Sequence, residues 1–303
     1  MDIRQLDMFR AVAEEASFTR AAERLHVSQS AISRQIKILE DELGGPLLHR
    51  GARHVSLTHP GELLLRMAHR VQRDMQEVVS QIGETHVLQR GTLALAGGMT
   101  VCIYILPRLL KKYRSLYKRI DLRVASGSAE ELQRMLRNHE IDLALLTLPV
   151  VEKDLQVIPA LKEEMVVVAA HGHPLMRQRT LEPAQVGKYP LIVYEPGSNT
   201  RKVIDQFFIE EQIPMDVAME TENVEIIKSM VAAGLGITII PYMAIARDVR
   251  HRRFAYARIR GWRLFRETAW VYVKSDYVPK AISEVLRVFD EMKDQFGMKP
   301  AGA

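Results

Sequence analysis

Apolar and small side chains recur at helical spacing near the start of the chain and predict two short helices joined by a tight turn over residues 18–37. Ser28 is expected to cap the second helix, because its hydroxyl can accept a hydrogen bond from a free backbone N–H. Apolar residues then follow at steps of four and three, at Ile32, Ile36, Leu39 and Leu43. This spacing predicts one buried face along the second helix, which is the organisation of a helix-turn-helix.

The opposite face of the second helix carries side chains that suit contacts with DNA. An amide can bind adenine, a guanidinium can bind guanine or phosphate, and hydroxyls or an ammonium can bind the backbone. The predicted DNA-binding residues are Phe18, Thr19, Arg20, Gln29, Ser30, Ser33, Arg34, Lys37, Arg50 and Arg53. The last two flank a Gly-containing turn in residues 46–58, which predict a small wing. The alternative is a surface hairpin with a merely solvated polar face, and the wing disfavours it.

Residues 3–58 resemble the LysR-type transcriptional regulators. The matching motifs are Ile-Arg-Gln-Leu-Asp-Met-Phe-Arg-Ala-Val-Ala (3–13), Ser17-Phe18, Ala21-Ala22, Val-Ser-Gln-Ser-Ala-Ile-Ser-Arg-Gln-Ile (27–36), Leu39-Glu40, Leu43-Gly44, Arg50 and Leu57-Thr58. Leu48 stands where the family usually has Phe, and Ser30 stands where Pro is frequent. The resemblance covers essentially the whole chain and implies a sequence-specific DNA-binding transcriptional regulator.

An uninterrupted apolar stripe follows the wing and predicts a long helix over residues 59–90. Its members lie at alternating steps of four and three, the a/d seam of a coiled coil, at Leu64, Ala68, Val71, Met75, Val78 and Ile82. The alternative is an amphipathic helix that packs on its own domain. The resemblance implies that this helix pairs with its copy in a second subunit, and that pairs of dimers form a tetramer. Two recognition helices held about one turn of DNA apart would read an interrupted inverted repeat.

From residue 91 onward, short apolar strands alternate with helices, which predicts α/β wiring with a largely parallel sheet. Two such series, joined near residues 160–163 and near Glu267, would make a hinged pair of lobes. The resemblance supports this, because the family's effector domain looks like a periplasmic binding protein. The predicted fold class is therefore α/β, with an N-terminal all-α winged helix-turn-helix. The predicted parts are a DNA-binding domain (1–58), a linker and dimerisation helix (59–90), and an effector-binding domain (91–303) with lobe 1 at 91–162 and 268–303 and lobe 2 at 163–267.

Three strand-to-helix junctions carry glycines and hydroxyls, and such junctions lie at the carboxyl ends of strands, where ligands bind. Helix N-termini there offer free N–H groups to an anion, and Arg201 could hold a carboxylate, sulfate or phosphate. The predicted effector-binding residues are Gly98, Met99, Thr100, Ser128, Ser198, Asn199, Thr200, Arg201 and Asn223. The resemblance places the family's effector contacts at Thr100, Ser128 and residues 198–201. Each junction alone could be an ordinary turn and N-cap. The three together favour a small anionic effector, either an inorganic oxyanion or an organic carboxylate.

The net charge of +5 and the pI near 9.2 are a mild excess that suits a polyanionic partner. Much of it comes from an arginine-rich stretch at 247–266, which could be a second nucleic-acid surface, a solvated face, an oligomer contact or a collar for an anionic ligand. The single Cys102 excludes an internal disulfide and fits a reducing cytoplasm. Neither a secretory signal nor an apolar run long enough to span a bilayer is expected.

Nucleophile motifs, phosphate-binding loops and closed zinc sites are missing from the sequence, so neither an enzyme nor a cofactor or metal is expected. The expected partners are double-stranded DNA, a small anionic effector, further copies of the chain and RNA polymerase. The rival hypothesis is an architectural DNA-binding protein with a ligand-insensitive sensor domain. The sequence leaves open which genes are regulated and whether they are activated or repressed.

Overall fold

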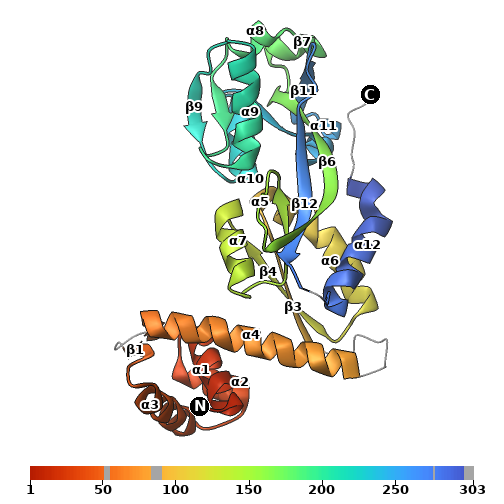
Figure 1. The fold of residues 1–303 in the computed structure, drawn as a ribbon. Helices are drawn as coiled ribbons and strands as arrows, with labels where there is room; N and C mark the ends of the chain where they lie inside the picture. Colours follow the sequence, from red (N-terminus) through yellow and green to blue (C-terminus); the bar gives the residue numbers. More distant parts are fainter. Residues whose placement is uncertain (51–54, 83–90, 276, 297–303) are drawn as a thin grey trace. The chain divides into compact units, whose positions relative to one another are not determined.

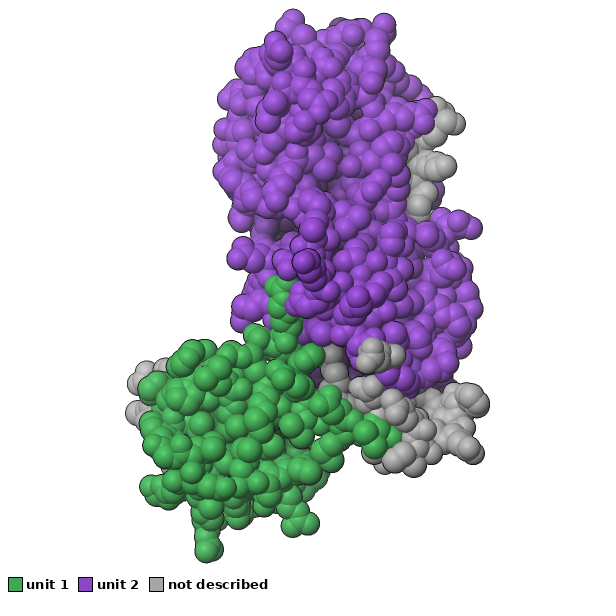
Figure 2. Space-filling model, in the orientation of Figure 1, with its two compact units in different colours: residues 1–86, 137–140 green, residues 87–136, 141–303 purple. Residues whose placement is uncertain are grey.

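The computed structural model describes residues 1–50, 55–82, 91–275 and 277–296 of the chain (Figure 1). The chain divides into two compact units, residues 1–86 with 137–140 and residues 87–136 with 141–303 (Figure 2).

The first unit is a helix-turn-helix with a two-stranded wing and a long helix. Its elements are α1 (Ile3–Glu15), α2 (Phe18–Leu25), α3 (Gln29–Leu43), β1 (Leu48–Arg50), β2 (Val55–Leu57) and α4 (His59–Ile82). The hydroxyl of Ser28 accepts a 3.2 Å hydrogen bond from the backbone N–H of Ala31 and caps α3 as expected. The turn before it passes through His26, which has a left-handed backbone with a φ of 55°. The predicted helix-turn-helix is confirmed.

Three of the four apolar residues predicted along α3 are buried in the core of this unit. Ile32, Ile36 and Leu39 are fully buried. Leu43 is 47% exposed, because α3 ends there and the chain turns away at Gly44. The predicted stripe is therefore one residue too long.

Helix α4 packs its first turns on this same core. Leu64 and Ala68 are buried against it, whereas Met75 and Val78 are 44% and 52% exposed. The first half of the predicted dimer seam is thus used within the chain, which corrects the prediction of a seam running the full length of the helix. Of the predicted seam residues, Met75 and Val78, further along α4, are the ones left open.

The second unit is a two-lobed α/β structure. Its strands are β3 (Gly91–Gly97), β4 (Ile120–Ser126), β5 (Leu143–Thr147), β6 (Leu155–Ala170), β7 (Thr180–Leu181), β8 (Leu191–Val193), β9 (Val217–Glu220), β10 (Thr238–Pro241), β11 (Phe254–Ile259) and β12 (Phe265–Val273). Its helices are α5 (Met99–Tyr104), α6 (Leu106–Leu116), α7 (Ala129–Arg137), α8 (Pro183–Val186), α9 (Asn199–Glu210), α10 (Val224–Ala232), α11 (Ala246–Arg250) and α12 (Lys280–Phe296), with short 3₁₀ turns η1 (Pro174–Arg177) and η2 (Tyr242–Ala244).

Strands β6 and β12 lie side by side and pass between the two lobes (Figure 1). The strand order is β4-β3-β5-β12-β6-β11-β7, with β10 also paired to β6. The first part of β6 pairs with β12, and residues 165–170 pair with β10 and β11 in the second lobe. The two lobes are confirmed, and the continuous strands β6 and β12 join them at the two crossings expected near residues 160–163 and near Glu267.

Each lobe has its own hydrophobic core. In lobe 1, Trp270 of β12 meets Phe289 of α12 edge-on, with ring centroids 5.2 Å apart. In lobe 2, Phe207 of α9 and Phe254 of β11 are buried in a separate cluster. Packed lobes joined by a few strands are the arrangement expected of a hinged ligand-binding domain.

Candidate functional site

The exposed face of α3 presents most of the predicted DNA-binding side chains. Gln29, Ser30, Arg34 and Lys37 are exposed, and Ser33 is half-buried. Within the described residues the Arg34 guanidinium has neither a hydrogen bond nor an ion pair. The Lys37 ammonium has only an exposed carboxylate 3.8 Å away, an interaction of little strength. Such donors are available for a polyanion.

The predicted residues outside α3 are less uniform. Thr19 and Arg20 are exposed at the start of α2, while Phe18 is half-buried and packs against the core. The Arg20 guanidinium lies 3.6 Å from the carboxylate of Glu15. The side chain of Arg50 and the whole of Arg53 lie outside the described residues.

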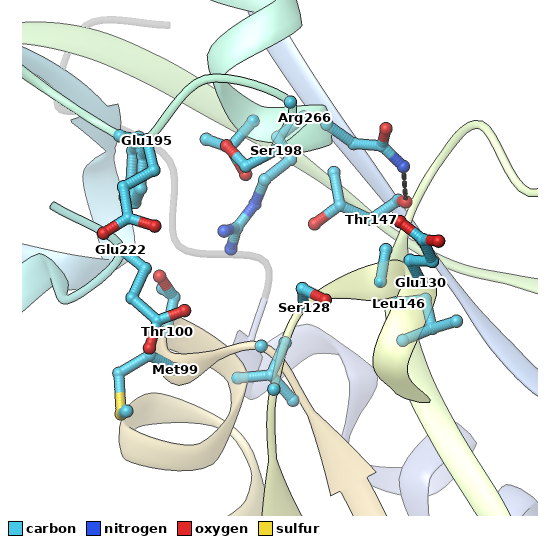
Figure 3. A pocket seen from close by; sticks show the side chains of 18 of the residues that line it. Met99, Thr100, Ser128, Glu130, Leu146, Thr147, Glu195, Ser198, Glu222 and Arg266 are labelled. Atoms are coloured by element: carbon cyan, nitrogen blue, oxygen red, sulfur yellow. Dashed lines mark hydrogen bonds between the residues drawn. The ribbon is translucent and has the colours of Figure 1, made fainter. Parts of the chain in front are cut away.

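A cavity of about 280 Å³ lies between the lobes of the second unit (Figure 3). The strand-to-helix junctions of both lobes form its walls. Predicted residues that line it are Gly98, Met99, Thr100, Ser128, Ser198, Asn199 and Thr200. Glu222, a weaker candidate in the sequence, also lines the cavity. Lining residues that the sequence patterns did not single out as site residues include Glu130, Leu146, Thr147, Tyr194, Glu195, Pro196 and Arg266. The sequence therefore predicted the junctions but not the residues that complete them.

Two of the lining hydroxyls also cap helices. Ser128 Oγ accepts a 3.2 Å hydrogen bond from the N–H of Glu131 at the start of α7. Ser198 Oγ accepts a 3.1 Å hydrogen bond from the N–H of Arg201 at the start of α9. Capping uses one lone pair of each hydroxyl and leaves its O–H as a donor. The ordinary N-cap and the ligand-facing role are compatible here, and two helix N-termini bring partial positive charge to the cavity wall.

Arg201 does not line the cavity, which corrects its prediction as the anion ligand. It is 9% exposed, and its guanidinium is held within lobe 2. Nε donates to Asp205 at 2.6 Å, and Nη1 donates to Glu220 at 2.7 Å and to the Tyr194 carbonyl at 2.8 Å. With these acceptors the side chain ties α9 to the neighbouring strand.

Asn223 is likewise absent from the cavity wall. Its Oδ1 accepts a 2.9 Å hydrogen bond from the N–H of Glu225 and caps α10. For this residue the ordinary N-cap is the role that the structure gives.

The cation that faces the cavity is Arg266 of β12, the last residue of the arginine-rich stretch. It is 2% exposed, and Nε and Nη2 donate to Glu163 Oε2 at 3.0 and 2.6 Å. Arg266 and Glu163 are register partners on β12 and β6, the strands that cross between the lobes. Figure 3 shows the guanidinium pointing into the middle of the cavity. The sequence places the crossings near residues 163 and 267. The negative Glu163 at one crossing and the positive Arg266 at the other were the signal in the sequence that could have predicted this pair.

Two other arginines of the stretch are paired with carboxylates. Arg258 pairs with Glu164 at 2.6 Å, and Arg260 pairs with Glu182 at 2.9 Å. Only Arg266 corresponds to the predicted collar for an anion.

Side chains from the two lobes are hydrogen-bonded beside the cavity. Asn199 Nδ2, from lobe 2, donates to the carbonyls of Thr147 and Pro149 in lobe 1 at 2.7 and 3.0 Å. The dashed line at Thr147 in Figure 3 marks the first of these bonds. Tyr104 of α5 donates to Glu225 of α10. The buried ammonium of Lys228 donates to the Tyr104 hydroxyl at 2.7 Å. Burial and the hydrogen bond to Glu225 raise the pKa of Tyr104, so it stays a protonated donor. These contacts hold the lobes together in this conformation.

Other candidate chemistry finds little support in the described part of the chain. The Cys102 thiol is half-buried, donates to the Gly97 carbonyl at 3.3 Å, and has its pKa raised by burial. Among the described residues, acidic, histidine and cysteine side chains form no cluster that could hold a metal ion. None of the described helices is both long and apolar enough to cross a membrane.

Comparison with known proteins places both units in one family. Residues 3–62 match the family described as "Bacterial regulatory helix-turn-helix protein, lysR family", and residues 86–293 match "LysR substrate binding domain". The "HTH-type transcriptional activator CmpR" of Synechocystis is 31% identical over 95% of this chain and 93% of that protein. The "RuBisCO operon transcriptional regulator" of Allochromatium vinosum is 30% identical over 90% of each. A full-length OxyR variant from Pseudomonas aeruginosa has a TM-score of 0.79 and 26% identity, covering 95% of this chain and 94% of that one.

Proposed function

Because this chain belongs to the LysR family and is a DNA-binding transcriptional regulator with an effector-binding domain, we propose that an effector with an acidic group binds between its lobes and changes its affinity for promoter DNA. The observation that carries the proposal is the cavity, where Arg266 and the N-termini of α7 and α9 meet. A bound acidic group would accept hydrogen bonds from the Arg266 guanidinium and from free backbone N–H groups at the two helix N-termini. The effector then favours one arrangement of the lobes over another, and DNA binding shifts with that population.

The size of the cavity bears on the choice between an inorganic oxyanion and an organic acid. A cavity of about 280 Å³ has room for several water molecules. A sulfate would leave much of that space to water, whereas a small organic acid would fill it. Apolar lining by Leu146 and Pro196 also suits a carbon skeleton. We therefore favour the organic acid.

On the DNA side, the exposed face of α3 is proposed to lie in the major groove, with Gln29 and Arg34 at base edges and Lys37 on phosphates. Thr19, Arg20 and the wing arginines would contact the backbone. The proposed location is the cytoplasm, where promoter DNA is present. RNA polymerase is the proposed protein partner at the promoter.

Self-association is proposed to use the open side of α4. Leu63, Met67, Met75 and Val78 are 36–52% exposed in the single chain, a long apolar strip on one helix. Pairing two copies would bury this strip and set two α3 helices to read an inverted repeat. Replacing Met75 and Val78 with aspartate is expected to reduce the molar mass measured by light scattering and to weaken binding to a full repeat more than to a half-site.

The effector proposal is tested by substitutions in the cavity wall. Thr100→Ala and Ser128→Ala are expected to leave DNA binding without effector intact and to reduce the effector response at least tenfold. Ser115→Ala is the matched control, because its hydroxyl bonds only within α6. Titrations of a labelled promoter fragment at fixed salt give both quantities. Loss of DNA binding in both cavity variants would mean that they damage the fold, and an unchanged response would remove the cavity from the mechanism. If no ligand changes the DNA affinity of the wild-type protein, the hypothesis of an architectural DNA-binding protein would be favoured.

A further inference from the structure

We infer that the effector is a zwitterion of amino-acid size, with an ammonium group as well as its acidic group. The inference rests on the proposed function, since it takes the cavity between the lobes as the effector site. Its basis is the charge of the residues that line the cavity, which is opposite to what a purely anionic ligand needs. The charged side chains in the wall are one arginine, Arg266, and three glutamates, Glu130, Glu195 and Glu222.

The single cation is already balanced from behind by Glu163, whose Oε2 lies 2.6 Å from Nη2. The three wall glutamates are exposed, and their carboxylates make no hydrogen bond or ion pair with any described residue. Acidic residues of lobe 2 outside the cavity wall are paired, for example Glu220 with Arg201 and Glu225 with Lys228. A ligand carrying only negative charge would therefore bind beside unneutralised carboxylates, which repel it.

Two of these glutamates define where the positive group would lie. Glu130 is in the first turn of α7, where a carboxylate is stabilised by the helix N-terminus without any ligand. Glu195 and Glu222 lie outside the helices, and both come from lobe 2. Figure 3 shows them on the same side of the Arg266 guanidinium. An ammonium group on that side would meet both carboxylates while the acidic group stays at Arg266.

The inner end of the cavity supplies independent support for a ligand. Arg266 is only 2% exposed, points into the cavity, and its Nη1 has no hydrogen-bond acceptor among the described residues. The buried hydroxyl of Tyr194 lies near Thr100 without a hydrogen bond of good geometry to the part of the chain described. A buried hydroxyl without a partner is costly unless something binds it. The acidic group of the ligand would satisfy both.

The test compares each proteinogenic L-α-amino acid with its 2-hydroxy-acid counterpart, which keeps the carboxylate and replaces the ammonium with a hydroxyl. Binding to the full-length protein is measured by thermal shift and calorimetry, and DNA affinity is measured in the same buffer. We expect at least one amino acid to bind about 10- to 100-fold more tightly than its hydroxy acid, the range for a hydrogen bond to a charged group. Glu195→Gln with Glu222→Gln should reduce that preference to below threefold. Glu210→Gln, at the far end of α9, is the matched control and should leave it unchanged.

Hydroxy acids that bind as tightly as the amino acids would overturn the inference, and so would a panel in which no amino acid binds. A preference that survives the double substitution would show that Glu195 and Glu222 are only solvated charges, and would also overturn it. The proposed function fails in a different way. In that case a compound binds in the calorimeter, but the affinity for a selected DNA site does not change.

Discussion

The buried ion pair between Arg266 and Glu163 gives the sharpest test of the hinge. Both side chains are 3% exposed, and two guanidinium nitrogens share one carboxylate oxygen at 3.0 and 2.6 Å. The other oxygen, Oε1, is buried without a partner among the described residues. Removing one member of such a pair leaves the other charge buried alone and costs about 3–5 kcal/mol. Replacing both residues with apolar side chains of similar size often leaves the free energy of unfolding unchanged or raises it.

We therefore expect Arg266→Met and Glu163→Leu each to lower the free energy of unfolding by about 3–5 kcal/mol. The double variant should lie within about 1 kcal/mol of the wild type, far from the sum of the two losses. Urea unfolding followed by tryptophan fluorescence is suited to this test, because Trp262 and Trp270 both lie in the second unit. The double variant should also fold yet lose its response to an acidic effector.

The neighbouring pair on the same strands is the control. Lys162 and Glu267 are register partners, and Lys162 Nζ lies 2.9 Å from Glu267 Oε1. Their side chains are 58% and 51% exposed. Lys162→Met should cost no more than about 0.5 kcal/mol, because exposed pairs contribute little. Single losses below about 1 kcal/mol at Arg266 and Glu163, or a double variant that equals their sum, would refute the account of a coupled buried pair.

Four further predictions concern other parts of the molecule. Arg34→Ala should weaken binding to a specific site by about 1–3 kcal/mol in anisotropy titrations at fixed salt, and a change below twofold would exclude a base contact. Asn199→Ala removes two hydrogen bonds between the lobes, each worth about 0.5–1.5 kcal/mol, so amide exchange near Thr147 should accelerate; unchanged exchange would mean that the bonds do not hold the lobes. Burial would raise the pKa of Glu284, but hydrogen bonds from neighbouring Lys, Tyr and Arg side chains outweigh it and lower the pKa to about 2. The stability it gives is therefore present above pH 4.5 and lost as the pH falls toward 2, so Glu284→Gln should melt below the wild type at pH 7, with a gap that narrows from pH 4.5 downward; a constant gap would contradict this. Since burial raises the pKa of Cys102, a thiol reagent should react slowly with the folded protein at about pH 8 and rapidly in urea, and rapid reaction with the folded protein would show that the thiol is open.

Local patterns in the sequence predicted the elements whose partners are close along the chain. Helical spacing and the cap at Ser28 were enough for the helix-turn-helix, because its core is made mostly from neighbouring helices. The junctions around Thr100, Ser128 and Ser198 were predicted for the same reason, since a strand end and a helix cap are local features.

Long-range pairing was beyond those patterns. Arg201 follows a helix cap and looked available, but Glu220 and Asp205 occupy its guanidinium once α9 packs in lobe 2. Arg266 lies 103 residues from Glu163, and only the register of β6 with β12 brings them together at the cavity. The apolar stripe on α4 correctly predicted a helix with one apolar face. Its spacing is the same whether that face packs within the chain or against a second subunit, so the sequence could not distinguish the two.

The central claim is that this protein regulates promoters by reading DNA sequence through α3. The most direct measurement is the capture of genomic fragments from the native organism by the full-length protein and by Arg34→Ala, followed by sequencing. The account predicts that the wild type enriches interrupted inverted repeats upstream of a few operons and that the variant loses this enrichment. Uniform, salt-sensitive capture by both proteins would show backbone binding alone and would contradict the account.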